Sequence, residues 1–554
     1  MAKEIIITFQ PSGRSVFVLP GTILLEAIEQ AGVILETPCG GSGKCGKCLI
    51  RIVSGKCHPS EHEEDVVGQA KFEQGYRLAC HCKADGPLTI EVPDSSLFQS
   101  GIQILSHNTA EHVEVEAGGI PGQRFGIAFD IGTTTLVGTL VDMATGADLA
   151  VSSSVNPQTS YGDDVVARIK KCRDDADGLR LLNGSIRKAV NSIIGKLLKH
   201  SGVDKNAVIQ IVCAGNTTMQ EILCNIDPSS LGEMPFTPAI LDPVRMKASE
   251  MKLAGINPDA DVFVFPNIGG FVGGDTVAGI VATRLDRRPE PSLLVDVGTN
   301  GEIVLAHGGR LMATSVAAGP AFEGARIVSG MRAANGAIEK VVTEDGDIKI
   351  NVIGNCKAVG ICGSGLIDIT AELLRLGVLD STGRIVEPDE LSSGLPAAIR
   401  KRVFNDKGQL AFILATGTIT ASGEPLMLWQ KDIRELQLAN GAIRAGINIL
   451  LKMEGLKPED LGSILLAGAF GNFIRRNNAV RIGMLPQVPN DRIRFVGNAS
   501  SFGAKRALLS AAEKEYAIKI RRETRHVDLS LSPDFQTEFS EAMLFPEEDV
   551  GYGG

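Results

Sequence analysis

The sequence predicts a multidomain protein of mixed α+β and α/β class, in which a small N-terminal unit, a linker and a large duplicated α/β fold follow one another. Three observations predict this architecture. The chain has 554 residues, a length typical of three or four domains. Residues 1–94 combine short alternating strands with a cysteine-rich loop. Further along, a strand–Asp–x–Gly–Thr unit occurs twice at a domain-scale separation, which indicates duplication.

The N-terminal unit begins with two apolar runs, residues 3–9 and 14–19, which the turn sequence P-S-G joins as a hairpin. Residues 23–31 follow with apolar side chains at helical spacing. After the cysteine loop, we expect a strand over 49–54 and an acidic turn over 61–65, and the unit closes with the alternating strand P-L-T-I-E-V. The order is hairpin, helix, cysteine loop, strand, cysteine, strand.

The loop T-P-C-G-G-S-G-K-C-G-K-C at residues 37–48 carries the most specific chemistry of this unit. It places Cys39, Cys45 and Cys48 among four glycines, and Cys80 follows in R-L-A-C. Glycine accepts a positive φ and lets backbone amides point toward sulfur. The spacing differs from the plant-type pattern C-x4-C-x2-C…C by one extra residue in the first gap. These four cysteines are therefore the expected ligands of a [2Fe–2S] cluster.

Three other kinds of site compete for the same loop. A phosphate loop needs Ser or Thr where Cys48 stands. A dithiol redox pair lacks a surrounding βαβ unit and leaves Cys39 without a role. A structural zinc site would need a second close pair, such as Cys80 with Cys82. Cys82 is also the alternative fourth ligand of the iron–sulfur cluster.

Composition excludes several classes of function. The formal net charge of −10 argues against nucleic-acid binding, because a basic surface is needed to neutralise phosphates. The sequence contains no apolar run of the length that spans a membrane, and its first residues do not read as a signal peptide. Eleven cysteines in a large chain of this kind indicate a reducing compartment, so we expect a cytoplasmic protein.

The segment 95–123 has no sustained periodicity and is the expected linker. After it, residues 125–142 read F-G-I-A-F-D-I-G-T-T-T-L-V-G-T-L-V-D, and residues 292–306 read S-L-L-V-D-V-G-T-N-G-E-I-V-L-A. The two aspartates, Asp130 and Asp296, are 296 − 130 = 166 residues apart. One such turn is weak evidence, whereas two copies in equivalent strand contexts favour a duplicated fold.

Two facing turns of this kind suit phosphate chemistry. Glycine turns let backbone amides and threonine hydroxyls approach phosphate oxygens. An aspartate at each strand end can hold Mg²⁺ through water or orient the attacking water. Asp130 and Asp296 are therefore the candidate catalytic residues. The candidate phosphate contacts in the two turns are Gly132, Thr133, Thr134, Gly298, Thr299 and Asn300.

These motifs carry two resemblances. Residues 1–95 resemble the β-grasp fold of plant- and adrenodoxin-type ferredoxins, which implies Cys39, Cys45, Cys48 and Cys80 as cluster ligands. The paired turns resemble the superfamily of sugar kinases, heat-shock-cognate ATPases and actin. Three further glycine turns, A-G-N-T-T-M, G-I-C-G-S-G-L-I-D and L-L-A-G-A-F-G-N-F, suit phosphate, ribose or adenosine contacts. They add the ATP-binding candidates Asn216, Thr217, Gly363, Ser364, Gly468, Phe470 and Gly471.

A ferredoxin unit ahead of such an ATPase fold resembles the reductive activators of corrinoid proteins over about residues 3–547. Also matching are N-P-Q-T-S-Y-G-D-D, P-N-I-G-G-F-V-G-G-D, A-G-P-A-F-E-G-A and Q-K-D-I-R-E-L-Q. The resemblance implies a middle domain over 124–205 that takes part in homodimerisation, and an actin-like ATPase domain over 206–554. No cysteine follows Cys362, so the chain resembles the branch with a [2Fe–2S] cluster and no further clusters.

The resemblance implies an ATP- and Mg²⁺-dependent enzyme that passes one electron from a [2Fe–2S] cluster to cobalt(II) of a corrinoid protein in a methyltransferase system. An upstream donor would supply the electron. Two other functions stay open: an ATP-driven donor to another low-potential acceptor, and a non-catalytic redox-sensing module. The ferredoxin unit disfavours the first, because the related dehydratase activators hold a [4Fe–4S] cluster between subunits. The presence of both Asp130 and Asp296 disfavours the second.

Overall fold

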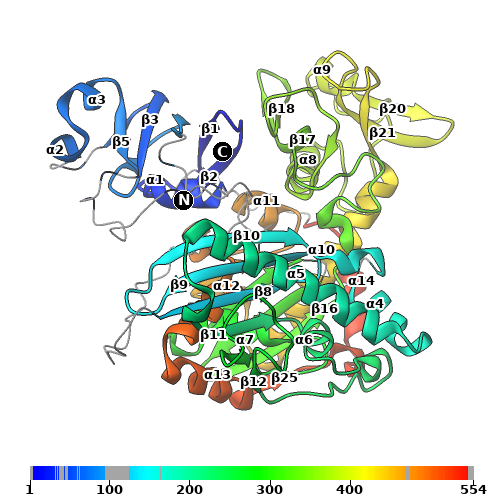
Figure 1. Ribbon diagram of the computed structural model, residues 1–554. Coiled ribbons are helices and arrows are strands. Elements are labelled where there is room, and N and C mark those ends of the chain that lie inside the picture. The colour runs from blue at the N-terminus through cyan, green and yellow to red at the C-terminus, as the bar shows by residue number, and fades with distance from the viewer. Residues whose placement is uncertain are drawn as a thin grey trace.

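The structure is a computed structural model that describes residues 4–31, 33, 35, 43, 46, 48–58, 60, 63–93, 96, 124–162, 164–298, 300–468 and 474–546. Figure 1 shows how the elements are arranged. Most of the expected linker lies outside the described residues. So do five of the candidate site residues: Cys39, Cys45, Thr299, Phe470 and Gly471.

The N-terminal unit is a five-stranded mixed sheet in the order β2-β1-β7-β3-β5 with short helices beside it. β1 is antiparallel to β2 and parallel to β7, and Leu88 and Ile90 of β7 alternate into the core. The expected hairpin, helix and closing strand are confirmed. Its elements are β1 (Ile5–Gln10), β2 (Ser15–Val18), α1 (Leu24–Gln30), β3 (Leu49–Ser54), β4 (Cys57–His58), α2 (Glu63–Val67), α3 (Gln69–Glu73), β5 (Tyr76–Leu78), β6 (Lys83–Ala84) and β7 (Leu88–Glu91).

Helix α2 occupies part of the segment expected to be an acidic turn. Glu63 explains the difference, because its carboxylate accepts hydrogen bonds from the backbone N–H groups of Ser60, at 3.1 Å, and of Leu78. Acidic residues in the first turn also stabilise the helix N-terminus. The expectation of a turn was wrong for residues 63–65.

The first large sheet has the order β10-β9-β8-β11-β13-β12. β8 is antiparallel to β9 and parallel to β11, and β11 is parallel to β13. The elements of this half are β8 (Phe125–Ile131), β9 (Thr135–Asp142), β10 (Asp148–Val155), α4 (Val165–Asp174), α5 (Gly178–Ser201), β11 (Val208–Gly215), α6 (Thr217–Leu223), β12 (Val244–Lys247), β13 (Asp261–Val264) and α7 (Gly274–Thr283).

The second large sheet repeats this pattern in the order β24-β23-β14-β15-β16-β25. β14 is antiparallel to β15 and parallel to β23, and β23 is parallel to β24, so β14 corresponds to β8. This repetition confirms the duplicated fold. The elements are β14 (Ser292–Val297), β15 (Gly301–His307), β16 (Arg310–Val316), α10 (Gln430–Met453), β23 (Ser463–Ala467), α11 (Arg476–Arg481), β24 (Ile493–Gly497), α12 (Ala499–Leu509), α13 (Ala511–Glu523), β25 (Thr524–His526) and α14 (Phe535–Ala542).

Helices α7 and α12 join the two halves. A buried cluster includes Val212 of the first sheet, Leu294 of the second, Ile280 of α7 and Ala504 of α12. Gly503 lets the two helices approach closely, because a Cβ there would lie 2.0 Å from the carbonyl oxygen of Ala278. Any larger residue at 503 would therefore force the helices apart.

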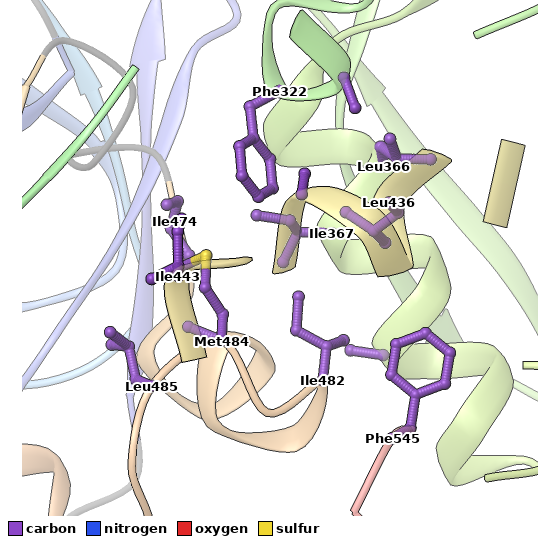
Figure 2. Packing of buried hydrophobic residues seen from close by; sticks show 14 of the residues in the cluster. Phe322, Leu366, Ile367, Leu436, Ile443, Ile474, Ile482, Met484, Leu485 and Phe545 are labelled. Atoms are coloured by element: carbon purple, nitrogen blue, oxygen red, sulfur yellow. The ribbon is translucent and has the colours of Figure 1, made fainter. Parts of the chain in front are cut away.

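The remaining elements form a lobe beside the second sheet. They are β17 (Ala337–Glu344), β18 (Asp347–Val352), β19 (Gly360–Ile361), α8 (Gly363–Arg375), α9 (Ala397–Arg400), β20 (Val403–Asp406), β21 (Gln409–Ala415) and β22 (Leu426–Trp429). Figure 2 shows the core under this lobe, where Ile367 of α8 and Ile443 of α10 lie among residues of the α11 region and the C-terminal Phe545.

The division expected between residues 205 and 206 falls inside the first sheet, since β8 and β11 pair in parallel across it. The sheet continues to β12 and β13, and α7 ends at Thr283. The structure therefore favours a division between α7 and β14 over one at residue 205.

Candidate functional site

Two of the four expected cluster ligands lie together in the described residues. The Sγ atoms of Cys48, just before β3, and Cys80, just after β5, are 3.3 Å apart, and both residues are buried. Gly43 and Gly46 of the loop adopt positive φ values of 73° and 66°, the conformation that only glycine accepts without strain. Two thiols at this separation suit ligation of one iron–sulfur group.

Cys82 faces a different neighbour. Its thiol is hydrogen-bonded with the thiol of Cys57, which lowers the pKa of Cys57, and its side chain is fully buried. Since Cys80 is beside Cys48 and Cys82 is beside Cys57, the geometry favours Cys80 as the fourth ligand.

The first glycine turn follows Asp130 and is held from three sides. Asn156 donates from Nδ2 to the carbonyl oxygen of Gly132, at 2.9 Å. The fully buried Arg168 donates to the carbonyl oxygen of Thr133, at 2.7 Å. Asn216, the N-cap of α6, donates to Thr133 Oγ1, at 2.8 Å. The structure thus brings Asn216 to the turn that sequence reasoning assigned to phosphate.

The second glycine turn is likewise closed by a backbone hydrogen bond from its glycine. The N–H of Gly298 donates to the carbonyl oxygen of Asn300, at 2.9 Å, as that of Gly132 donates to Thr135, at 3.1 Å. Gly468, with a φ of 88°, packs on Asp296: a Cβ at this position would lie 2.5 Å from Asp296 Oδ1. Gly468 must therefore be glycine for both conformation and space.

Asp130 and Asp296 are connected through the end of β24. Gly468 N–H donates to the carbonyl oxygen of Gly497, at 3.0 Å. The next residue, Asn498, donates to Asp130 Oδ2 at 2.8 Å, and Ser500 donates to Oδ1 at 2.9 Å. Both aspartates therefore meet at the junction of the two halves.

Two further carboxylates complete this group. Asp275 lies in the first turn of α7, and Glu302 is directly opposite Asp296 in the β14–β15 register. Burial and the neighbouring carboxylates raise the pKa of Asp275 and of Asp296 to about 7 and the pKa of Glu302 well above its usual value. Burial also raises the pKa of Asp130, although Asn498 and Ser500 oppose this.

A cation would relieve this repulsion, so the carboxylates fit a Mg²⁺ site. All four side chains keep some exposure, which allows access. Among the described residues, no three Asp, Glu, His or Cys side chains converge closely enough to hold a metal directly. Mg²⁺ commonly keeps several waters and binds through one or two carboxylates plus phosphate, which agrees with this spacing.

Two candidate nucleotide contacts have other bonds. Thr217 is fully buried, and its hydroxyl donates to the carbonyl oxygen of Gly269, at 2.9 Å. Ser364, beside Gly363 at the start of α8, donates to the carbonyl oxygen of Glu339, at 3.0 Å. Ser364 is thus bonded to Glu339, which contacts Ser15 of the N-terminal unit and is not one of the four carboxylates. Nucleotide contacts by these residues stay predictions.

Comparisons with known proteins agree with this geometry. Three family models match in sequence: a 2Fe-2S iron–sulfur cluster binding domain over residues 7–85, the RACo middle region over 125–288, and the C-terminal domain of RACo, the ASKHA domain, over 290–552. The corrinoid activation enzyme RamQ of Eubacterium limosum is 31% identical over 95% of this chain and 96% of its own length. The chain belongs to the RACo family.

Two further proteins are similar to this chain of the RACo family. A Co(II) methylated amine-specific corrinoid protein reductase of Methanosarcina barkeri is 26% identical and covers 74% of this chain and 75% of its own. A solved structure, a reductive activator for corrinoid, iron–sulfur protein, is 30% identical with a TM-score of 0.67 and covers 98% of both chains. Within the described part of this RACo-family chain, no helix has the length and apolar character to cross a bilayer.

Sequence reasoning on this RACo-family chain missed the groups that hold its aspartates. Asn498 and Ser500 lie in V-G-N-A-S-S, directly after a strand and before a helix, which is the same strand–glycine–polar pattern as the identified turns. Asp275 and Glu302 stand in or beside quoted motifs, G-G-D and T-N-G-E, but were assigned no role. Arg168 had no signal in the sequence, because its role depends on contacts with distant backbone.

The carboxylate repulsion predicts that Asp275→Asn stabilises the RACo-family protein at pH 8 without divalent cations. A folded-state pKa of about 7, above the unfolded value near 3.8, means that wild-type stability falls as pH rises between these values. The asparagine avoids this loss, so we expect a gain on the order of 2 kcal/mol at pH 8 that vanishes near pH 4. Thermal melting in chelator at both pH values measures it. A lower melting temperature for the variant at pH 8 would contradict the repulsion.

Proposed function

We propose that the protein is an ATP-dependent reductive activator, which delivers one electron from a [2Fe–2S] cluster to cobalt(II) of a corrinoid protein and restores cobalt(I). One observation carries the proposal: a single chain combines a buried Cys48–Cys80 thiol pair in a ferredoxin sheet with a duplicated fold in which burial and the charge of Asp130 raise the pKa of Asp296. The names of the relatives support the same acceptor, since two are described by their action on corrinoid proteins.

The cluster residues have a separate task from the ATPase residues. Cys48 and Cys80, with Cys39 and Cys45 of the same loop, would hold the iron–sulfur group, which supplies a one-electron carrier of low potential when bound. The burial of Cys48 and Cys80 keeps water from their thiolates. The thiols flank strands of the ferredoxin sheet and Asp296 lies in β14 of a large sheet, so we assign the electron to the first site and phosphate chemistry to the second.

The residues of the ATPase site position the phosphate and the attacking water and polarise them. Asn498 and Ser500 fix Asp130 in one orientation, and Gly468 packs against Asp296. We propose that Asp130 and Asp296 carry Mg²⁺ through water, and that Glu302, opposite Asp296, orients the attacking water. The turn at Thr133 would bind phosphate through its backbone amides, with Arg168 and Asn216 keeping the turn rigid. This is catalysis by positioning and electrostatics.

ATP is needed because electron delivery to cobalt(II) is expected to be uphill from a cluster with a reduction potential of about −400 mV. Each deficit of about 59 mV lowers a one-electron equilibrium ten-fold. ATP can offset such a deficit only if its binding or hydrolysis favours one conformation over another. Thr134 of the first glycine turn donates to Glu323 of the second half, at 3.4 Å, so a change in the first turn can reach the second half.

The test is ATP turnover with and without a cobalt(II) corrinoid protein. We expect turnover to rise when that protein is added, and cobalt(I) absorbance to develop only with ATP present. Replacing ATP with a non-hydrolysable analogue then tells binding from hydrolysis. If ATP turnover is unchanged by corrinoid proteins but drives the reduction of another low-potential acceptor, the alternative donor function is favoured. If the protein does not turn over ATP at all, a sensing module is favoured.

The finer assignments are also proposals. We infer Mg²⁺ as the divalent cation, an upstream reductase as electron donor, a methyltransferase system as context, a homodimer, and a cytoplasmic location. The cysteine content and the carboxylate site support the location and the cation, respectively.

A further inference from the structure

The ferredoxin unit docks on the ATPase fold through its first hairpin. Ser15 of β2 is fully buried there: its N–H donates to Glu339 Oε1 at 3.2 Å, its hydroxyl accepts from Asn351 at 3.1 Å, and its carbonyl oxygen accepts from Lys340. At the hairpin turn, the N–H of Gly354 donates to the carbonyl oxygen of Ser12, at 2.9 Å. Residues of β17, β18 and the turn after β18 therefore hydrogen-bond directly to the hairpin, and those of β17 and the turn do so through its backbone.

A second contact lies at the start of α11. Arg476 forms an ion pair with Glu4, at 3.0 Å, and the two side chains are only 7% and 2% exposed. The guanidinium of Arg475 lies over the ring of Phe17, at 4.0 Å. Figure 1 shows β2 and α11 side by side at this contact.

Arg476 also reaches the carboxylate site through β24. Its Nε donates to the carbonyl oxygen of Ile493, at 2.8 Å, and its guanidinium lies over the ring of Phe495, 4.4 Å from the centroid. β24 ends at Gly497, and the next residue, Asn498, holds Asp130. One short strand therefore connects the residue that binds Glu4 with the residue that orients the catalytic carboxylate.

The contact between the ferredoxin hairpin and the ATPase fold is of a kind that can dissociate. Buried charges dominate it, and burial lowers the pKa of Lys340 to about 8 and raises that of Glu339. Glu4 Oε2 has no hydrogen-bond partner among the described residues. Desolvating charges offsets much of their mutual attraction, so a pair such as Glu4–Arg476 adds geometric specificity and little net stability.

We propose that Arg476 is a positioning residue that couples docking of the ferredoxin hairpin to the nucleotide site, through Glu4 on one side and β24 on the other. This inference rests on the proposed function, because it requires ATP to bind beside Asp130. By linkage, any effect of nucleotide on docking is matched by an equal effect of docking on nucleotide affinity.

Hydrogen–deuterium exchange of the intact, cluster-loaded protein tests the coupling. We expect saturating ATP to change the exchange rate of the peptides containing Ser15 and Gly354 by about five-fold or more. Glu4→Gln removes the ion pair with little change of shape. This variant should exchange faster in both peptides without nucleotide, lose most of the ATP response, and bind ATP with a dissociation constant altered by the same factor.

Glu91→Gln is the matched control: Glu91 of β7 lies beside Gln10 of β1, but the change removes only an exposed ion pair with Arg51, at 3.1 Å, and leaves the buried Glu4–Arg476 pair intact. It should keep the wild-type response. Arg476→Lys provides a second variant, and its effect should not add to that of Glu4→Gln. If wild type binds ATP but the two peptides do not respond, or if Glu4→Gln keeps the full response, the coupling is refuted. Failure of wild type to bind ATP refutes the proposed function instead.

Discussion

Asp296→Asn is expected to lower ATP turnover by about a hundred-fold or more while the visible spectrum of the iron–sulfur cluster stays unchanged. The asparagine keeps the size of the side chain but loses the charge that would hold Mg²⁺ opposite Asp130. Asp296 lies in β14 of the second large sheet, whereas Cys48 and Cys80 flank strands of the ferredoxin sheet. Steady-state turnover and the absorbance spectrum of the same sample check both parts.

Asp261→Asn is the control for this prediction. Asp261 is an exposed carboxylate of β13 that pairs with Lys247 at 2.6 Å, so its loss should change neither quantity. Loss of the cluster spectrum in Asp296→Asn would mean that the two sites are not separate. Normal turnover in that variant would remove Asp296 from the catalytic site.

Cys80→Ala is expected to lose nearly all bound iron, whereas Cys82→Ala keeps it. Cys80 faces Cys48 at 3.3 Å, but Cys82 is hydrogen-bonded with Cys57. A lost thiolate leaves the iron with one ligand too few. Iron content and visible absorbance after anaerobic reconstitution measure the difference, and nucleotide binding verifies that the ATPase fold is intact.

The reverse pattern, with iron lost from Cys82→Ala and kept in Cys80→Ala, would make Cys82 the fourth ligand. Equal loss from both variants would contradict the distinction drawn from the geometry. Because both residues are buried and both changes remove one sulfur, the pair is matched in packing cost.

Much of this fold was predictable because its determinants are local. Short stretches of sequence determine the hairpin at residues 5–18 and the two Asp-x-Gly-Thr turns, and the separation of the turns by itself indicates duplication. In the described part of the cysteine loop, Gly43 and Gly46 have the positive φ that the pattern implied. Local conformation and local chemistry coincide at these places.

Contacts between distant residues were not predictable. Asn498 and Asp130 are 368 residues apart, and Arg476 and Glu4 are 472 apart, so no periodicity relates them. The turn before α8 is an example. Its glycines suggested a nucleotide contact, but Ser364 donates a hydrogen bond to the backbone carbonyl of Glu339. The carboxylate of Glu339 in turn accepts a hydrogen bond from Ser15 of the ferredoxin hairpin. Tertiary packing determines which residues a glycine turn contacts, and the local sequence does not contain that information.

Electron transfer from pre-reduced protein to a cobalt(II) corrinoid protein, with no other reductant present, tests the account most directly. Electron paramagnetic resonance follows the reduced cluster, and absorbance follows cobalt(I). The account predicts that ATP addition removes one reduced cluster for each cobalt(I) formed, and that neither change occurs without ATP or in Asp296→Asn. Equal cobalt(I) formation without ATP, or cobalt(I) formation while the cluster stays reduced, would contradict it.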